Sequence, residues 1–460
     1  MDATTHRGGR RTRSPSVATL LSAVWPGLGQ LYLGHRQAAL VYAAPVVAAV
    51  VVLVAQAAGG LERFGLALLS PSVALTVLVL IGLLGLWRLL SMADAFLSAG
   101  GRRGLRAHPR RLWTVLGLTV AVVGVHGLGA YYAWSFYEAG SRIFVAEPGP
   151  GGETPGPGSS PGGEGMSGFP EATPIATPPS ASARINVLLI GADWAPNRDH
   201  SLTDTLLVVS IDPATKSAVM VSLPRDLGRF PLSDGRIYQG KINSLLTYAD
   251  AHRSEFPDGG LTTLVREVGY LIGVPIHYYA AINLPGFEAM IDAVGGVRIY
   301  NEKPIDDPEY SDWRDPSRRG FALSVGWHAL DGQTALAFVR SRRGIGNNDF
   351  ERARRQQQLL IALRAKLTDP AMAPRIPGLL AAAANTIRTN FPAERLPEML
   401  DLGRQVADGA ITRKVLGPPY AQRATDTSTY LLVPDMAAFA RVSIELFGAD
   451  SRYAQASSAP

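Results

Sequence analysis

The first 137 residues alternate long apolar runs with short basic stretches. Runs at about 38–58, 66–90 and 112–137 are each long enough to cross a hydrocarbon layer about 30 Å thick. We therefore expect three membrane-spanning helices. A further apolar stretch, 17–34, is interrupted by the sequence WPGLGQLYLG, with one proline and three glycines. This interruption favours a re-entrant or interfacial piece, and a fourth full span is the alternative.

The pattern changes sharply after the last apolar run. The segment from Glu147 to Ser182 reads EPGPGGETPGPGSSPGGEG and continues with further Pro, Ala and Thr. Such a composition cannot bury enough apolar surface to fold, so it predicts a tether that is partly flexible and partly polyproline-like.

Beyond residue 184, apolar runs rich in β-branched residues alternate with helical periodicity. Strands are predicted at Arg184–Ala192, Asp204–Ile211, Ser217–Leu223, 277–283 and 297–300. Helices are predicted at about 242–253, 260–272, 285–294, 331–339, 349–368, 372–387, 394–406 and 435–447. Alternating strands and helices indicate an α/β layered domain. Because the first three strands look like a meander, we expect a mixed central sheet.

These patterns divide the chain into six parts. They are a basic N-terminus (1–16), a multi-span helical membrane anchor (17–137), a Pro/Gly-rich linker (138–183), a catalytic α/β domain (184–370), a C-terminal helical extension packed on that domain (371–450) and a disordered tail (451–460).

The charges lie mainly beside the apolar runs. Residues 1–111 hold twelve arginines and three acids, a net of +9, so the remainder must carry −3 of the chain's total of +6. This distribution indicates membrane orientation and not a nucleic-acid partner. The positive-inside rule then places the N-terminus and the loop near 102–111 in the cytoplasm, and everything after residue 137 outside it. The absence of cysteine excludes disulfides, thiolate catalysis and Cys-ligated metal.

Three distant charges are predicted to meet at one rim of the sheet. If the first three strands run up, down and up, the end of the first lies beside the start of the second and the end of the third. Asp193 follows the first strand, Asp204 opens the second, and Arg225 follows the third. The paired carboxylates suit Mg²⁺ or Mn²⁺ completed by phosphate oxygens and water. The alternative is that Asp204 caps a turn and Asp193 is an ordinary loop residue.

A polar stripe is predicted on the helix at 349–368. Asp349, Arg352 and Gln356 stand at i, i+3 and i+7, on one face. The same face continues with Leu360, Leu363 and Leu367. The polar trio should therefore face inward, where an arginine without a partner is costly. A bound anion would supply that partner, and an internal Asp349–Arg352 ion pair is the alternative.

Four arginines form a predicted phosphate-binding cluster. Arg340 and Arg342 lie two apart between two helices, where extended geometry would aim both the same way. With Arg225 and Arg229 they would offer permanently charged, bidentate donors. Lys241 precedes a helix N-terminus and would add a further charge, although a surface role is equally consistent with the sequence.

Arg354 and Arg355 are expected to point elsewhere, into solvent. The sequence contains no P-loop, no HExxH and no GxSxG motif.

The ordered set of motifs resembles the LytR–CpsA–Psr family. The residues that carry the resemblance, over about 185–368, are Gly191-x-Asp193, Thr203-Asp204-Thr205, Ser222-Leu-Pro-Arg225-Asp226, Lys241-Ile-Asn243, Gly286-Phe287, Asp292, Gly295-Gly296-Val297, Leu330-Asp-Gly332-Gln-Thr-Ala-Leu, Val339-Arg340-Ser-Arg342, Asp349-x-x-Arg352 and Arg355-Gln356.

The resemblance implies a membrane-anchored, Mg²⁺-dependent phosphotransferase whose catalytic domain is extracytoplasmic. Such enzymes move a glycopolymer, for example teichoic acid, from a polyprenyl pyrophosphate carrier to peptidoglycan. Carried onto this chain, Asp193 and Asp204 would hold the metal. The groups that would grip the pyrophosphate are Arg225, Arg229, Arg340, Arg342, Arg352 and Gln356. Lys241 and Asp349 also match functional positions.

Two features depart from the family pattern. Leu202 stands where an arginine is common, two residues before the second aspartate, and the anchor has several spans where one is common. Two other functions remain open: a pyrophosphatase that uses water as the acceptor, and a non-catalytic binder of anionic wall polymer or lipid. A lipid substrate also requires an apolar groove, which we expect the sheet strands and the 260–272 helix to line.

Overall fold

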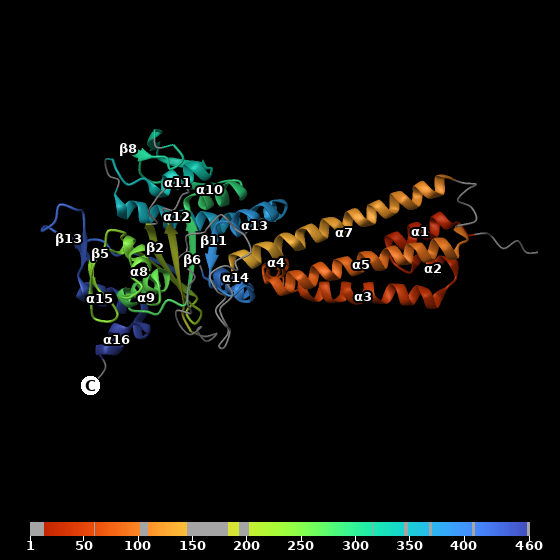
Figure 1. Cartoon of the computed structure of the whole chain (residues 1–460), viewed down its shortest axis with the longest axis horizontal. Coiled ribbons are helices and arrows are strands. Elements are labelled where there is room, and N and C mark those ends of the chain that lie inside the picture. The colour runs from red at the N-terminus through yellow and green to blue at the C-terminus, as the bar shows by residue number, and fades with distance from the viewer. Residues whose placement is uncertain are drawn as a thin grey trace, which may run out of the picture. The chain divides into compact units, whose positions relative to one another are not determined.

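The computed structural model describes residues 13–58, 60–101, 109–144, 183–192, 202–315, 317–344, 348–367, 370–406 and 410–457. The chain forms two compact units, Met1–Glu138 and Ala139–Pro460. Figure 1 labels their helices and strands.

Three helices of the first unit match the predicted spans. α3 (Arg36–Ala58), α5 (Pro71–Ser98) and α7 (Pro109–Ile143) are, among the described residues, the helices long and apolar enough to cross a membrane. Many of their Leu and Val side chains are exposed in the isolated protein, as lipid-facing side chains would be. A short helix, α4 (Leu61–Ala67), connects α3 to α5.

The ambiguous stretch 17–34 folds as a broken hairpin. α1 (Pro15–Val24) and α2 (Leu28–Leu33) are separated by Gly27, whose φ of 97° is readily accessible only to glycine. Each helix is far shorter than the roughly 20 residues that a span needs. The fully buried Gln30 donates to the carbonyl oxygen of Ser91 on α5 at 2.9 Å. This packing is consistent with a re-entrant or interfacial piece.

The second unit is built on a six-stranded mixed sheet, which confirms the predicted fold class. The strand order is β11-β6-β1-β2-β3-β12. The first three strands form the predicted antiparallel meander, while β6 runs parallel to β1 and β12 parallel to β3. The strands are β1 (Ile185–Ala192), β2 (Thr203–Asp212), β3 (Ser217–Leu223), β6 (Tyr278–Asn283), β11 (Ile387–Thr389) and β12 (Ile411–Val415).

The register brings several strand ends to one rim. Ala192, at the end of β1, pairs with Thr203 of β2 and Asn283 of β6. At the opposite end, Asp212 Oδ1 accepts hydrogen bonds from the backbone N–H groups of Ala214 at 2.9 Å and Thr215 at 3.3 Å, so it closes the turn between β2 and β3.

Helices cover both faces of the sheet (Figure 1). Successive strand side chains point to opposite faces, so Leu188 and Leu189 serve different layers. The core that contains Leu188 and Phe230 includes residues of α8 (Ile242–Ala251), α9 (Gly260–Ile272) and α15 (Met436–Phe447). A second core, around Ile291 and Phe338, joins α10 (Leu284–Ala293), α11 (Gly332–Arg340) and α12 (Asp349–Leu367). The predicted helix ends agree with these bounds to within about two residues.

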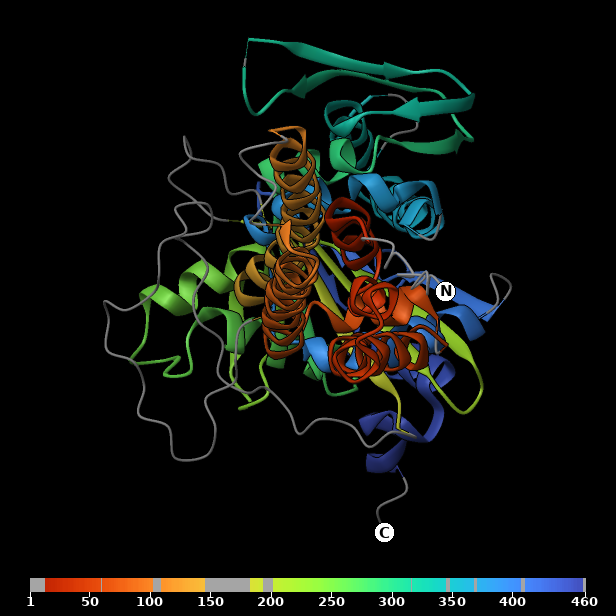
Figure 2. The same ribbon diagram turned by 90° about the vertical axis from the view of Figure 1, so that its right-hand side faces the viewer.

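Short strands outside the central sheet were not anticipated, apart from the predicted strand at 297–300. That strand is β7 (Val297–Asn301), which pairs with β10 (Gly326–Leu330) and not with the central sheet. Figure 2 shows this pair in teal, together with the strands at 305–311 and 319–323, beside helices of the α10–α12 layer. The remaining short strands are β4 (Gly228–Pro231), β5 (Ile237–Lys241), β8 (Ile305–Ser311), β9 (Arg319–Leu323), β13 (Ala421–Arg423) and β14 (Leu432–Pro434).

The C-terminal part differs from the predicted helical extension at 371–450. It supplies both edge strands of the central sheet, β11 and β12, so it completes the domain's core architecture. The predicted disordered tail at 451–460 begins with a short helix. The helical elements here are η1 (Pro370–Arg375), α13 (Ile376–Ala384), η2 (Ala393–Arg395), α14 (Leu396–Gln405), η4 (Gly448–Asp450) and α16 (Arg452–Ser457).

The last turn of α7 belongs to the second unit. Arg142 Nη1 donates to Asn385 Oδ1 at 3.0 Å, and Phe144 forms a parallel bridge with Thr389 of β11. The linker predicted at 138–183 therefore begins as helix. Residues 145–182, which hold most of its Pro and Gly, lie outside the described residues.

Candidate active site

Asp204 and Arg225 meet at the predicted rim of the sheet. Asp204 is the second residue of β2, and Arg225 follows Pro224, which stops β3. Arg225 Nη1 donates to Asp204 Oδ1 at 2.5 Å, and both side chains are mostly buried. The topological prediction is thus confirmed for these two residues, while Asp193 lies outside the described residues.

Arg352 and Gln356 project from α12 toward the same rim. Arg352 is only 5% exposed. Gln356 Nε2 donates to Thr205 Oγ1 at 2.9 Å and to the carbonyl oxygen of Val339 at 3.3 Å, so it links α12 to β2 and α11. Asp349 is the first residue of α12, but its side chain lies outside the described set.

The end of α11 supplies a second group of arginines. Arg340 is the last residue of α11, and Arg342 and Arg343 follow in the next three positions. Burial raises the pKa of the Tyr310 phenol, and the positive charge and hydrogen bond of Arg340 oppose that rise. Arg343 forms an ion pair with Glu309. Arg340 and Arg342 both lie at this site, although Arg340 ends a helix and does not belong to the extended segment that the prediction assumed.

Arg355 contradicts its sequence interpretation. It was expected in solvent, but it is 7% exposed, and its Nη2 donates to the carbonyl oxygen of Ser341. Its guanidinium carbon lies 5.5 Å from the centre of the Phe338 ring. Burial lowers the pKa of Arg355 to about 10. The neighbouring Arg354 is exposed as expected and pairs with Glu351 at 2.8 Å.

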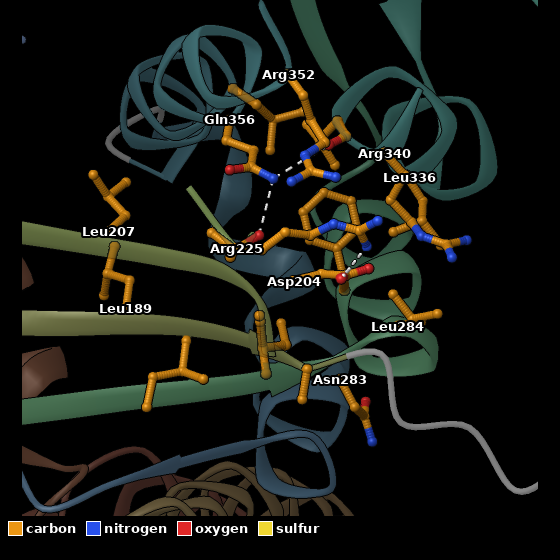
Figure 3. Close-up of a pocket in the computed structure, with 18 of the residues that line it drawn as sticks. Leu189, Asp204, Leu207, Arg225, Asn283, Leu284, Leu336, Arg340, Arg352 and Gln356 are labelled. Atoms are coloured by element: carbon orange, nitrogen blue, oxygen red, sulfur yellow. Dashed lines mark hydrogen bonds and ion pairs between the residues drawn. The ribbon is translucent and has the colours of Figure 1, made fainter. Parts of the chain in front are cut away.

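These groups surround a cavity of about 510 Å³ on the α10–α12 side of the sheet. In Figure 3, Arg225, Arg340 and Arg352 gather around Asp204, whereas Leu189 and Leu207 extend from the strands some way from them. The charged lining consists of six arginines and three carboxylates, which gives an excess of three positive charges over the described residues. They are Arg225, Arg319, Arg340, Arg342, Arg343, Arg352, Asp204, Asp307 and Glu309.

The rest of the cavity wall is mostly apolar, apart from the polar side chains of Thr205, Asn283, Tyr310, Ser311 and Gln356. β1, β2 and β6 contribute small and branched side chains, and the three helices above them contribute larger ones. This apolar lining includes Leu189, Leu207, Ala280, Ile282, Leu284, Phe287, Met290, Leu336, Leu359, Leu360, Leu363 and Ile387. The strands line the groove as predicted. The 260–272 helix does not, because α9 packs on the opposite face of the sheet. Leu367 is also not inward-facing, at 46% exposed.

Arg229 and Lys241 are not brought into the cavity lining. Arg229 lies in the β4–β5 hairpin with a φ of 51°, and its Nη1 donates to Asp426 at 2.6 Å. Lys241 Nζ donates to Asp226 at 2.5 Å. Asp226 Oδ2 also lies 3.6 Å from Arg225 Nε. The Asp226 carboxylate therefore lies between Lys241 and the site residue Arg225.

Several lining residues were missed by sequence reasoning. Arg343 carried a usable signal, because it is the third arginine within four positions of the chain. Arg355 does not line the cavity but supports it through Ser341. Its burial could also have been suspected, because it lies three positions after Arg352 and so on a neighbouring part of the helix surface. Arg319, Asp307, Glu309 and Tyr310 carried no signal, because the β8–β9 hairpin that presents them was not predicted.

The carboxylates fit only one mode of metal binding. No group of three or more His, Asp or Glu side chains that could hold a metal ion occurs among the described residues. Mg²⁺ usually takes one or two carboxylates and completes its shell with water and substrate phosphate oxygens. Asp204, on the wall of a guanidinium-rich cavity, fits that mode and not a cage made by protein alone.

Comparison with known proteins gives consistent matches. Residues 170–452 match the model of the LytR_cpsA_psr family. The chain is 29% identical over 258 residues to the polyisoprenyl-teichoic acid–peptidoglycan teichoic acid transferase TagU of Bacillus mycoides, which covers 56% of this chain and 76% of that protein. It is 30% identical over 231 residues to TagV of Bacillus subtilis, named as the same kind of transferase, which covers 50% of this chain and 54% of TagV.

Solved structures are also similar to part of this chain. The crystal structure of B. subtilis TagV aligns with a TM-score of 0.46 and 25% identity, over 58% of this chain and 96% of TagV. Because the family model spans more than half of the residues, the chain belongs to the LytR_cpsA_psr family.

Proposed function

We propose that this chain is a membrane-anchored transferase that moves a glycopolymer from a polyprenyl pyrophosphate carrier to peptidoglycan. The names of its relatives describe a polyisoprenyl-linked teichoic acid donor and a peptidoglycan acceptor. Transfer of a cell-wall polymer is therefore the function that family membership favours.

One observation carries the proposal: the same cavity is rich in guanidinium groups near the rim and mostly apolar over the remaining wall. A polyprenyl pyrophosphate has the same two parts, a doubly phosphorylated head and a hydrocarbon tail. Arginine matches phosphate oxygens in charge and geometry, while aliphatic walls exclude water from the tail.

The reaction then needs alignment and charge neutralisation more than covalent catalysis. The oxygen of an acceptor hydroxyl attacks the phosphorus attached to the polymer. The bond from that phosphorus to the bridging oxygen breaks, and polyprenyl monophosphate leaves. Arg225, Arg340 and Arg352 would neutralise charge that develops on the transferred and leaving phosphates. The hydroxyl proton would pass to a carboxylate, either Asp349 at the start of α12 or one of the pair Asp193 and Asp204.

A divalent cation, Mg²⁺ or Mn²⁺, would supply positive charge that stabilises the charge on phosphate oxygens. Asp204 would hold it, together with Asp193 after β1. Arg225 would orient Asp204 through their 2.5 Å contact. We further propose that the second unit is extracytoplasmic, on the basis of the arginines that flank the spans.

The proposal can be tested with the full chain in nanodiscs and a polyprenyl pyrophosphate-linked saccharide. Arg340→Ala should slow release of polyprenyl phosphate by about 10²-fold or more, since one donor to a developing oxyanion is typically worth that much. Arg354→Ala is the matched control, because this exposed arginine lies on α12 outside the cavity lining. Turnover of Arg340→Ala within a few fold of the parent chain would contradict the assigned site.

The same assay distinguishes the other functions. Equal release of polyprenyl phosphate with and without a peptidoglycan acceptor would indicate a pyrophosphatase. Binding of the lipid without turnover, unchanged by chelation of divalent cations or by Asp204→Asn, would indicate a non-catalytic binder.

A further inference from the structure

Asp307 occupies a position where the strand pattern calls for an apolar side chain. In β8 its neighbours Asp306 and Pro308 are exposed, whereas Ile305 and Asp307 point inward. Asp307 is 2% exposed. A buried carboxylate is costly unless donors surround it, so its presence requires local partners.

One oxygen of Asp307 holds the segment that follows α11. Its Oδ2 accepts a hydrogen bond from Ser341 Oγ at 2.8 Å, from the backbone N–H of Arg342 at 2.9 Å and from the backbone N–H of Arg343 at 3.0 Å. Two consecutive backbone donors on one acceptor fix the peptide planes from which Arg342 and Arg343 project. Asp307 therefore connects β8 to the backbone that carries two cavity arginines.

The other side of this segment is held by α12. Arg355 donates to the carbonyl oxygen of Ser341, whose side chain hydroxyl donates to Asp307. The backbone N–H of Ser341 in turn donates to the carbonyl oxygen of Ala337 at 2.8 Å, which ends α11 directly after Arg340. The segment 341–343 is thus fixed from β8, α11 and α12 at once.

We propose that Asp307 is a positioning residue that sets the backbone of 341–343, so that the guanidinium groups of Arg340, Arg342 and Arg343 are aligned for a diphosphate before it binds. The proposal rests on the proposed function of the cavity. Alignment made before binding matters because displacements of about 1 Å in charged donors can cost about 10²-fold in rate.

The test compares two ligands of the full chain in nanodiscs, with binding to empty nanodiscs subtracted. Geranylgeranyl pyrophosphate carries the head and a tail, while geranylgeraniol carries the tail alone. Asp307→Ala should lower the affinity for geranylgeranyl pyrophosphate at least tenfold. The affinity for geranylgeraniol should stay within twofold of that of the parent chain. Asp307→Asn keeps an oxygen acceptor of the same shape and should restore pyrophosphate binding to within threefold of the parent chain.

Asp312→Ala is the matched control. Asp312 is 5% exposed in the connection that follows β8, and it accepts from Arg314 N at 2.9 Å and Gln333 Nε2 at 2.6 Å. It follows the lining residue Ser311 but is not itself part of the cavity lining. The variant should lower thermal stability without changing the ratio of the two affinities. If Asp307→Ala does not fold, Ser341→Ala is the alternative, because it removes one of the three hydrogen bonds to Asp307. It should lower the affinity for geranylgeranyl pyrophosphate by about threefold and leave the affinity for geranylgeraniol unchanged.

Three results would overturn the inference: unchanged pyrophosphate binding, equal weakening of both ligands, or an Asn variant as weak as the Ala variant. Equal weakening would mean general damage to the fold, and a weak Asn variant would mean that charge and not alignment matters. If the parent chain itself does not bind geranylgeranyl pyrophosphate, the proposed function falls together with this inference.

Discussion

Replacement of Arg355 by methionine tests whether the site sacrifices stability for alignment. Burial is the chief cause that lowers the pKa of Arg355 from the ordinary guanidinium value to about 10. At 1.36 kcal/mol per pKa unit, holding this charge inside the protein costs about 3 kcal/mol. A hydrogen bond from a charged donor returns about 1.5–3 kcal/mol, and the contact with Phe338 returns about 0.5–1 kcal/mol. The two sides nearly cancel, so Arg355→Met should change the free energy of unfolding by less than about 1 kcal/mol.

The measurement is the melting temperature of the full chain at pH 7, followed by its affinity for geranylgeranyl pyrophosphate. A change of 1 kcal/mol corresponds to about 2–4 °C in domains of 150–250 residues. We expect a melting temperature within about 3 °C of the parent chain and an affinity at least fivefold lower, because the Ser341 carbonyl loses its donor. Arg354→Met, one position earlier and exposed, should change neither value.

The pH dependence has a defined sign. The folded-state pKa of Arg355 lies below its unfolded value, so the penalty is fully present below about pH 10. As pH rises through 10, the folded state releases the proton before the unfolded state does, and the parent chain gains stability relative to Arg355→Met. A loss of 6 °C or more for the variant at pH 7 would refute the reasoning, because it would mean that the buried charge is strongly stabilising.

Three further changes have defined outcomes. Leu189→Gln places an amide in the apolar wall of the cavity. In a binding titration it should lower the affinity for geranylgeranyl pyrophosphate by about tenfold and leave the affinity for inorganic pyrophosphate unchanged. Phe338→Ala empties a fully buried position of α11 and should cost about 3–5 kcal/mol, read as a large drop in melting temperature; a drop under 3 °C would contradict the packing. Burial raises the pKa of Asp212, but hydrogen bonds from Thr215 and Ala214 and the charge of Arg184 outweigh it and leave the value lowered. Asp212→Ala should therefore lower the melting temperature above pH 4, and its difference from the parent should vanish as the pH falls through the folded pKa of Asp212; a constant difference at every pH would exclude this account.

The central elements could be predicted because their own sequences carry strong signals. The helix predicted at 260–272 is α9 with the same end residues, since apolar periodicity and a C-terminal glycine mark it unambiguously. β1, β2 and β3 are continuous apolar runs separated by turn residues. Their meander also fixed the rim where Asp204 and Arg225 meet, because strand order alone determines which strand ends are neighbours.

The remaining elements depend on partners that a local pattern does not reveal. β11 and β12 are three and five residues long and exist as strands because β6 and β3 offer them an edge. The β8–β9 hairpin is polar and contains Pro308, so it lacks clean alternation. The lining residues that this hairpin presents, among them Asp307, Glu309 and Arg319, were therefore missed as well. Arg229 was misplaced for a related reason: its direction follows from the β4–β5 hairpin, which the sequence did not predict.

The contact between the end of α7 and β11 changes what the Pro/Gly-rich segment 145–182 can do. Phe144 and Ala183, which flank this segment, both belong to the second unit, so the segment starts and finishes on the same body. A segment whose two ends lie on the same unit does not act as a spacer, because lengthening it moves neither end. Its length is therefore free to vary without moving Phe144 or Ala183, the two points at which it joins the second unit.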